Sequence, residues 1–270
     1  MTKTISRFPP PAHDFDKYDL YSRAVQNPGT DALFFQKVYR ELRERQPRIL
    51  REDFCGTFQV CCEWVKLDEE NAAFGLDLDP EPVAYGRERY LSRLAPEQRR
   101  RVRVELKNVL DRDLPMADIV AAENFSYFIF KRRAKLLSYF ENCRASLLPG
   151  GLLILDAFGG TDNHTEGEEE TDHGDFTYYW DQQLFDPITC HTRFAIHLRP
   201  KCGPKFENCF TYDWRMWSIP EIRELLAEAG FRHSHVYWEG TAGEKGDGIF
   251  TRVRTGEACE SWIAYIAAEK

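Results

Sequence analysis

Positive charge is scarce in this chain of 270 residues. The 36 Lys and Arg residues are outnumbered by 44 Asp and Glu, which gives a net charge of −8. Binding to nucleic acid by counterion release needs clustered cations. The one basic run, residues 97–107, covers the end of a predicted helix and the start of a predicted strand, where cations are favoured by the helix dipole. We interpret this run as a solvated face and expect no nucleic-acid partner.

Long apolar runs are absent as well. No run approaches the ~20 residues that a membrane-spanning helix needs, and residues 1–19 lack the apolar stretch of a secretory signal. We therefore expect a cytoplasmic protein with no membrane partner.

Cysteine is present, but not in the spacing of a metal site. The eight cysteines form no CxxC pair and no Cys/His pattern suited to zinc. Most of them fall in predicted core segments, so we expect free buried thiols and no bound metal.

Strand and helix patterns alternate from about residue 48 to residue 158. Residues 31–45 form an amphipathic helix before this region, with Phe34, Val38 and Leu42 at helical spacing. Five strand-like runs then alternate with helices, and the last two strands have the continuous apolar character of strands buried on both faces. This alternation predicts an α/β fold with a doubly wound, mostly parallel sheet.

The pattern changes after Gly160. Residues 163–175 are acidic and polar and predict an exposed loop, and three strand-like runs then suggest an antiparallel sheet. Ser218 and Glu221 form a capping box for a helix that ends at Gly230, and final strand-like runs predict an antiparallel edge. We expect an N-terminal cap and helix (1–47), a main domain (48–160 and 218–270) and an antiparallel β insertion (161–217) that acts as a lid.

A candidate ligand site follows the first two strands of the main domain. The turn at residues 52–57 contains Gly56 and lies between a strand and a helix, where backbone N–H groups are exposed at the carboxyl end of a sheet. Asp77 ends the next strand, 21 residues later, at the spacing of an acid that binds ribose hydroxyls. Asp79 is the second choice for that role.

These residues resemble the first motifs of the class I S-adenosylmethionine-dependent methyltransferases, which have a Rossmann-like fold. Glu52 takes the acidic position of the motif acidic-x-Gly-x-Gly-x-Gly, and Cys55-Gly56-Thr57 resembles its centre. Phe54 and Phe58 replace the first and third glycines, so we expect a less open turn. The resemblance implies S-adenosylmethionine as cofactor, bound in this part of the chain by Glu52, Asp53, Cys55, Gly56, Asp77 and Leu78.

The resemblance continues along the chain. Asn108 and Val109 match the family segment that binds adenine, and Glu123 and Asn124 close the fourth strand where the family positions the methyl donor. Leu148 to Leu152 resembles the turn into the fifth strand. The aromatic segment 15–22 is similar to N-terminal segments that close over the donor, and Tyr21 is our candidate in it, with Tyr18 as the other choice.

The acceptor pocket is expected to use the insertion. An aromatic face could stack on an amine or a planar substrate, and it could equally pack the insertion against the core. The candidate substrate residues are Tyr127, Tyr178, Trp180, Arg215 and Trp217, with Tyr212 as a further candidate. The insertion also resembles antiparallel elements that pair subunits, so a homodimer is a further expectation.

The chemistry implied is methyl transfer to a small-molecule N or O acceptor by in-line displacement. No residue stands out as general base, and the candidates are His164, His173, His191, Asp213 and His233. One alternative is a non-catalytic S-adenosylmethionine-binding or regulatory protein on the same fold. A nucleotide-dependent oxidoreductase is the other, although Phe54 and Phe58 prevent the GxGxxG turn that a dehydrogenase uses.

Overall fold

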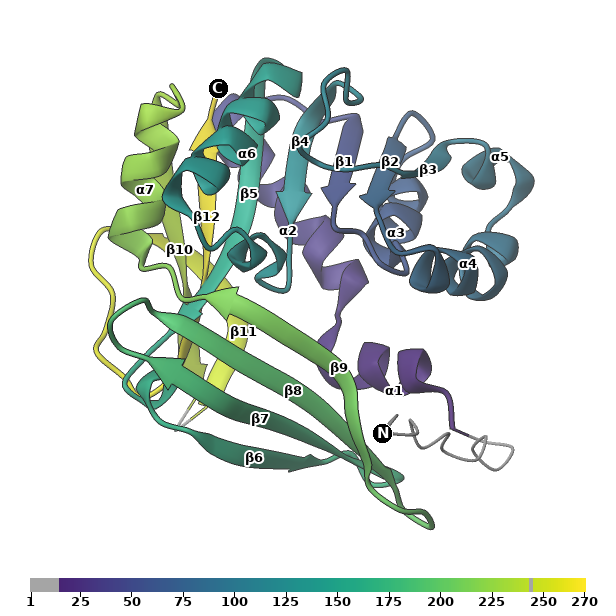
Figure 1. Ribbon diagram of the computed structural model, residues 1–270. Coiled ribbons are helices and arrows are strands. Elements are labelled where there is room, and N and C mark those ends of the chain that lie inside the picture. Colours follow the sequence, from purple (N-terminus) through teal and green to yellow (C-terminus); the bar gives the residue numbers. More distant parts are fainter. Residues whose placement is uncertain (1–14, 243–244) are drawn as a thin grey trace, which may run out of the picture.

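The computed structural model describes residues 15–242 and 245–270, which form two β-sheets with helices packed around the larger one (Figure 1). The larger sheet has eight strands in the order β11-β10-β12-β5-β4-β1-β2-β3, and the smaller has four in the order β6-β7-β8-β9. Residues 1–14, part of the predicted N-terminal cap, lie outside the described residues.

The larger sheet is parallel in its first five strands and antiparallel at one edge. β5 pairs parallel with β4, whereas β12 pairs antiparallel with β5 and β10 antiparallel with β12. Its strands are β1 (Ile49–Asp53), β2 (Ala72–Asp77), β3 (Val102–Leu106), β4 (Ala117–Ala122), β5 (Leu147–Gly159), β10 (His233–Ala242), β11 (Lys245–Val253) and β12 (Trp262–Glu269). The predicted α/β class, with a mostly parallel doubly wound sheet and an antiparallel C-terminal edge, is confirmed.

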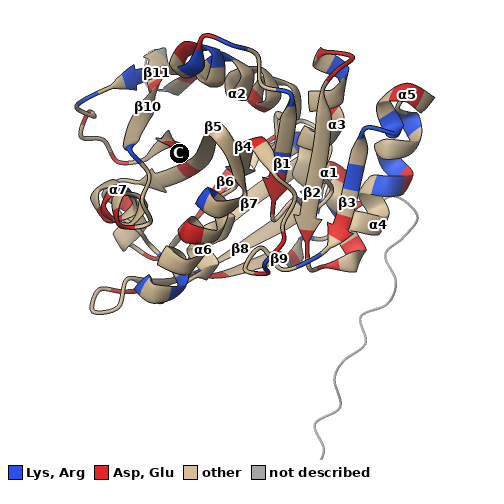
Figure 2. Cartoon of the chain, turned by 90° about the horizontal axis from the view of Figure 1, so that it is seen from above, with Lys and Arg blue, Asp and Glu red and all other residues tan. Residues whose placement is uncertain are grey.

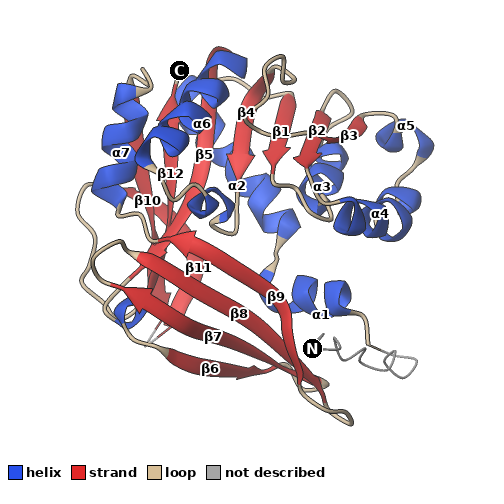
Figure 3. Cartoon of the chain, viewed as in Figure 1, coloured by secondary structure: helices blue, strands red, loops and turns tan. Residues whose placement is uncertain are grey.

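Helices cover both faces of this sheet (Figure 3). They are α2 (Pro28–Arg43), α3 (Gln59–Leu67), α4 (Pro80–Arg89), α5 (Pro96–Arg99), α6 (Arg133–Ser146) and α7 (Ile219–Glu228), whereas α1 (Lys17–Val25) lies beside the smaller sheet. Helices α6 and α7 pack on one face in a cluster with Leu136, Phe140 and Ile222. The helices α2 and α3 pack on the other face, through Phe35 and Trp64 among others. Parallel strands buried on both faces explain the continuous apolar runs of the sequence.

The smaller sheet is formed by β6 (Gly167–Asp172), β7 (Phe176–Asp186), β8 (His191–Pro200) and β9 (Phe206–Arg215). It lies below the carboxyl ends of the parallel strands, with α1 beside β9 (Figure 1). The prediction of an exposed loop over 163–175 was wrong in part, because β6 pairs with β7 along six residues. All six residues of β6 are exposed, so this edge strand carries no apolar alternation that could have marked it.

Acidic residues end several of the parallel strands, among them Glu52, Asp53 and Asp77, whereas the arginines of the basic run gather around α5 and the start of β3 (Figure 2). Arg101 of that run donates to the backbone carbonyls of Val65 (2.9 Å) and Asp68 (3.0 Å). Arg101 therefore holds neighbouring backbone, whereas Arg100 of the same run is exposed, as expected of a solvated face.

The described helices and the cysteines bear on two expectations from the sequence. No helix among the described residues is long and apolar enough to cross a membrane. All eight cysteines are free, but only four are buried: Cys55, Cys61, Cys62 and Cys143. Cys202 and Cys259 are exposed, so the expectation of buried thiols holds for half of the set.

A buried ion pair within β1 is hydrogen bonded to α6. The Arg51 Nε donates to Asp53 Oδ1 at 2.8 Å and its Nη2 to Asp53 Oδ2 at 3.1 Å, and both side chains are fully buried. The Tyr139 hydroxyl donates to the same carboxylate at 3.0 Å, and Arg51 Nη1 donates to Ser146 Oγ at 2.6 Å. Two N–H···O bonds join the guanidinium to the carboxylate, and each group has a further hydrogen bond, so these interactions offset the cost of removing both charges from water.

Removing one partner of this pair should strongly destabilise the fold. We expect Asp53→Ala to lower the free energy of unfolding by about 3–5 kcal/mol, since it leaves the Arg51 charge buried and uncompensated. Urea denaturation measures this, with Glu97→Ala as control because Glu97 pairs with Arg100 in solvent. The double variant Arg51→Met with Asp53→Leu should recover most of the loss. A small effect of Asp53→Ala alone would contradict this account.

Candidate functional site

The turn after β1 adopts an unusual backbone conformation. Phe54, Gly56 and Phe58 all have positive φ values of 57°, 49° and 48°. This left-handed conformation costs a non-glycine residue roughly 1–2 kcal/mol. The Phe54 ring packs against Phe130 and Tyr139, and Phe58 is fully buried, so aromatic burial offsets that cost. The two phenylalanines thus keep the backbone conformation that glycines adopt readily.

Two carboxylates hold this turn in place. Asp77 Oδ2 accepts the Gly56 N–H at 2.7 Å, and its other oxygen accepts the Asp79 N–H at 2.8 Å. Glu52 Oε2 accepts the Cys61 N–H at 2.9 Å in the first turn of α3. A carboxylate is favoured at a helix N-terminus, where backbone N–H groups lack partners.

A second turn, after β4, lies beside the first. Asn124 and Phe125 both have positive φ (53° and 57°). Their N–H groups donate to Asp156 Oδ2 at 2.6 Å and Oδ1 at 2.9 Å. One buried carboxylate on β5 therefore fixes the direction in which both side chains leave the sheet.

Between these turns and α1 lies a cavity of about 310 Å³, which we call the polar cavity. Its lining includes seven residues predicted to bind cofactor: Tyr21, Glu52, Asp53, Cys55, Gly56, Glu123 and Asn124. Asp79, the second choice for the ribose, lines it too. Asp77 is not in this lining, but it fixes the turn by accepting the Gly56 N–H.

The other predicted cofactor residues lie outside this lining. Leu78 is 64% exposed. Asn108 Oδ1 accepts the Leu110 N–H at 2.9 Å, and Val109 is buried. The prediction that the Asp53 side chain binds the cofactor was wrong. Its carboxylate pairs with Arg51 and accepts the Tyr139 hydroxyl on the opposite face of β1, so only the rest of the residue borders the cavity.

Helix α1 covers the polar cavity and bridges the two sheets. Asp16 caps the helix by accepting the Tyr18 and Asp19 N–H groups, and its other oxygen accepts the Tyr85 hydroxyl at 2.8 Å. On the insertion side, the Tyr21 ring packs 4.7 Å from Phe210 of β9. Of the segment 15–22, both Tyr18 and Tyr21 reach the cavity.

A second cavity of about 300 Å³, the aromatic cavity, adjoins the first and shares Tyr21, Asn124 and Tyr212 with it. The rings around it pack on one another: Tyr212 and Trp214 have centroids 4.4 Å apart, and Trp180 and Phe194 4.6 Å. The remaining lining is mostly apolar and consists of Ala24, Val25, Phe125, Phe158, Tyr178, Trp180, Trp214, Ile196, Ser261 and Ile263.

Three predicted substrate residues do not reach this cavity. Tyr127 is fully buried under α6, and its hydroxyl donates to the Asp156 carbonyl at 2.8 Å. Arg215 pairs with Glu221 at 3.0 Å and stacks on buried Trp217. Side chains alternate along a strand, so Tyr212 and Trp214 face the cavity and Arg215 does not; Trp217 lies beyond the end of β9. Tyr178 and Trp180 do line the cavity, whereas Trp214, Phe125 and Phe158 were missed.

The general-base candidates lie elsewhere. His191 and Lys131 pair with Asp213, His164 packs on Phe185, and His173 stacks on Phe176. None of these residues, nor His233, is in the lining of either cavity. Because side chains alternate along β9, the inward direction of Tyr212 and Trp214 implies that Asp213 faces the other way.

Carboxyl groups with raised pKa values gather at this end of the sheet. Burial raises the pKa of Glu52 and of Asp156 to about 7, against the lowering effect of the N–H groups that they accept. Burial also raises the pKa of Asp31 to about 6 and that of Glu123 well above its usual range. Among the described residues, the Glu123 carboxyl has no hydrogen-bond partner, unlike the other three.

One group of residues has the ligand types of a metal site. The side chains of Glu168, Asp181 and His197 converge on the smaller sheet. However, the Asn208 N–H donates to His197 Nδ1 at 2.8 Å, which leaves the ring proton on Nε2, 3.1 Å from Asp181. With Lys205 Nζ also 2.5 Å from Glu168, hydrogen bonds and an ion pair account for the group without a metal.

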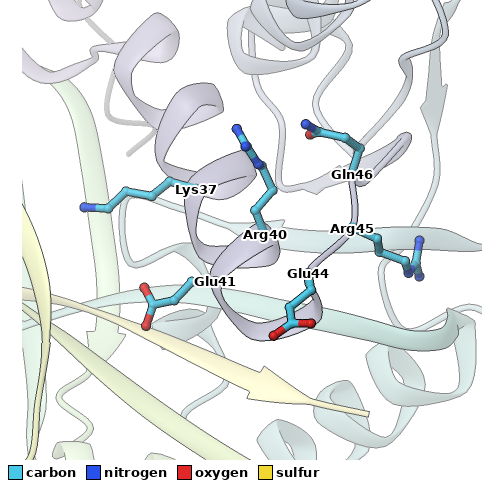
Figure 4. A pocket seen from close by; sticks show the side chains of 6 residues that line it. All are labelled: Lys37, Arg40, Glu41, Glu44, Arg45 and Gln46. Carbon is cyan, nitrogen blue, oxygen red and sulfur yellow. The ribbon is translucent and has the colours of Figure 1, made fainter.

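A further hollow of about 580 Å³ lies at the C-terminal end of α2, before β1 begins (Figure 4). It is lined only by the polar side chains of Lys37, Arg40, Glu41, Glu44, Arg45 and Gln46. Parallel α/β sheets bind ligands at the carboxyl ends of their strands, and this hollow is at the amino end. We therefore place the functional site at the polar and aromatic cavities.

Comparison with known proteins supports this fold. No family model and no curated protein sequence matches the chain. Among solved structures, the CcbJ methyltransferase from Streptomyces caelestis matches with a TM-score of 0.68 and 16% identity, covering 90% of this chain and 96% of its own. The sugar N-methyltransferase KedS8 from Streptoalloteichus has a TM-score of 0.64 and 18% identity, with 100% and 98% covered.

A third similar structure is CalS10 with S-adenosylmethionine bound, an amino pentose methyltransferase from Micromonospora echinaspora. Its TM-score is 0.64 at 18% identity, and the match covers 94% of this chain and 98% of CalS10. The resemblance predicted from the sequence is thus confirmed for the fold: this chain has the architecture of the S-adenosylmethionine-dependent methyltransferases.

Proposed function

We propose that the protein is an S-adenosylmethionine-dependent methyltransferase that acts on a small-molecule N or O acceptor. The observation that carries the proposal is the pair of adjoining cavities, one polar and one aromatic, which meet at Tyr21, Asn124 and Tyr212. Such a pair can hold a polar methyl donor on one side and an apolar acceptor on the other, with their reacting atoms at the boundary.

The residues of the polar cavity fit S-adenosylmethionine. Gly56 has open space where a Cβ would lie, so a ligand can approach the backbone closely. Glu52, Glu123 and Asp79 offer carboxylates for the ammonium group and the ribose hydroxyls. When bound, S-adenosylmethionine would supply a methyl group on a sulfonium: the lone pair of the acceptor bonds to the methyl carbon, and the C–S electron pair leaves with the sulfur.

The aromatic cavity fits the acceptor. Methyl transfer mainly requires alignment of the nucleophile and exclusion of water. The rings of Trp180, Tyr212 and Trp214 give a rigid apolar wall, and α1 closes the polar cavity beside it. A catalytic base is not essential for an acceptor that attacks in its neutral form.

Ligand titration followed by turnover tests the proposal. We expect calorimetry to show binding of S-adenosylmethionine and S-adenosylhomocysteine and no binding of nicotinamide dinucleotides. Turnover with a set of amines and phenols should then yield S-adenosylhomocysteine. Binding without turnover across a broad set would favour a non-catalytic regulatory role, and preferential binding of a nicotinamide dinucleotide would overturn the proposal.

Asp77 should matter for cofactor affinity. We expect Asp77→Asn to weaken S-adenosylmethionine binding by roughly 1.5–3 kcal/mol, or about ten- to a hundredfold, because it removes a charged acceptor that fixes the Gly56 turn and is the predicted ribose partner. The control is Asp68→Asn. Asp68 also accepts the N–H of the residue two positions later, Glu70, but it lies before β2 begins and therefore far from the carboxyl ends of the strands. Equal dissociation constants for the two variants would contradict the assignment.

Cofactor affinity should also depend on pH through Glu52. Its pKa is raised to about 7, so the side chain is mostly protonated at pH 6 and ionised at pH 8. A ligand ammonium group prefers the ionised form, and we expect S-adenosylmethionine to bind several-fold more tightly at pH 8 than at pH 6. Glu52→Gln should flatten this dependence, whereas Glu63→Gln, on the exposed side of α3, should keep it. An unchanged slope in Glu52→Gln would rule out Glu52 as its source.

A further inference from the structure

The two cavities of the proposed site differ sharply in their charge. In the described lining of the aromatic cavity there is no Lys, Arg, His, Asp or Glu. The polar cavity has one cation, Lys17, whose Nζ lies 2.8 Å from Glu81. Within residues 15–242 and 245–270, an acceptor with a phosphate, sulfate or carboxylate group would therefore find no free cation in the lining of either cavity.

A third space, the acidic hollow, opens from the aromatic cavity. It has a volume of about 300 Å³ and shares Phe158, Trp180 and Ser261 with that cavity. Its charged lining is entirely acidic: Asp162, Glu166, Glu168 and Glu169. Glu168 pairs with Lys205, but over residues 15–242 and 245–270 the other three have no ion pair within 4.0 Å.

The register of β6 directs one of these acids toward the aromatic wall. Glu169 pairs with Trp180, and Glu170 pairs with Tyr179. Because paired residues share a face of the sheet, the Glu169 carboxylate lies on the side of the Trp180 ring, and Glu170 lies on the opposite side. Burial raises the pKa of the Tyr178 hydroxyl, which belongs to the same wall, and the nearby Glu169 charge raises it further.

A further acid without a partner, Glu123, lines the polar cavity. Glu123 precedes Asn124, which lines both cavities, and no described residue hydrogen bonds to its carboxyl group. Aromatic faces attract cations, and more strongly where water is excluded. An aromatic wall near unpartnered carboxyls is thus complementary to a cation and repels an anion.

We propose that the acceptor is an organic amine with an apolar or aromatic body, which is cationic in free solution and enters the aromatic cavity past the acidic hollow. This inference rests on the proposed function and narrows it from N or O transfer to N transfer. The amine loses one proton before its lone pair forms the new N–C bond. Glu123, which lines the polar cavity next to Asn124, can accept that proton in its ionised form.

The test compares three probes that share one aromatic body in the presence of saturating S-adenosylhomocysteine. They are 2-phenylethylamine, 2-phenylethanol and 3-phenylpropionate, and calorimetry measures their affinities. We expect the amine to bind about tenfold more tightly than the alcohol and the carboxylate to bind most weakly. Equal affinities, a preference for the alcohol or the carboxylate, or no binding of any probe would overturn the inference.

A matched pair of variants locates the effect. Glu169→Gln should weaken amine binding about threefold and leave alcohol binding unchanged, whereas Glu170→Gln, on the opposite side of the same strand, should change neither. If both variants behave alike, the hollow does not contribute to the preference and this proposal fails. Failure of S-adenosylhomocysteine itself to bind would instead reject the proposed function, so the two failures are distinguishable.

Discussion

The site depends on carboxylates that accept backbone N–H groups in two left-handed turns. Asp77 accepts from Gly56, and Asp156 accepts from Asn124 and Phe125. These bonds hold the turns after β1 and β4 in conformations that most residues adopt only at a cost. The same turns supply the floor of the polar cavity and part of the wall of the aromatic cavity, so both cavities follow from two local hydrogen-bond arrangements.

Burial of these acids links structure to chemistry. A carboxylate removed from water gains a raised pKa unless hydrogen bonds or positive charges favour its ionised form. Glu52, Glu123 and Asp156 share one face of the sheet without a cation beside them. In their ionised forms these three groups place negative charge at the carboxyl ends of the strands, where a sulfonium and an ammonium group would be stabilised and would in turn favour ionisation.

Much of the architecture was predictable from the sequence because helical spacing, strand alternation and helix caps depend only on neighbouring residues. Phe34 and Val38 of the predicted helical stripe are buried in α2, and the capping box of Ser218 and Glu221 starts α7 as predicted. Edge strand β6 was missed because its residues are polar on both faces, so neither alternation nor composition distinguishes it from a loop. Its existence depends on pairing with β7, which is a non-local property.

The site was predictable at the glycine turn and less so at the insertion. Residues at strand ends, such as Glu52, Gly56 and Asn124, line the polar cavity because parallel strands bring their carboxyl ends together. Trp214 could have been chosen over Arg215 from the alternation that includes Tyr212. By contrast, Ile263 lines the aromatic cavity from the start of β12, and only the tertiary fold brings that segment close.

The central claim is that the polar cavity holds an adenosyl sulfonium beside the boundary with the aromatic cavity. A crystal structure of the protein grown with S-adenosylhomocysteine tests it most directly. The account predicts density along the Gly56 turn, with the ligand sulfur beside Tyr21 and Asn124 and pointing toward the aromatic cavity. Density at another place, or a sulfur directed away from that boundary, would contradict it.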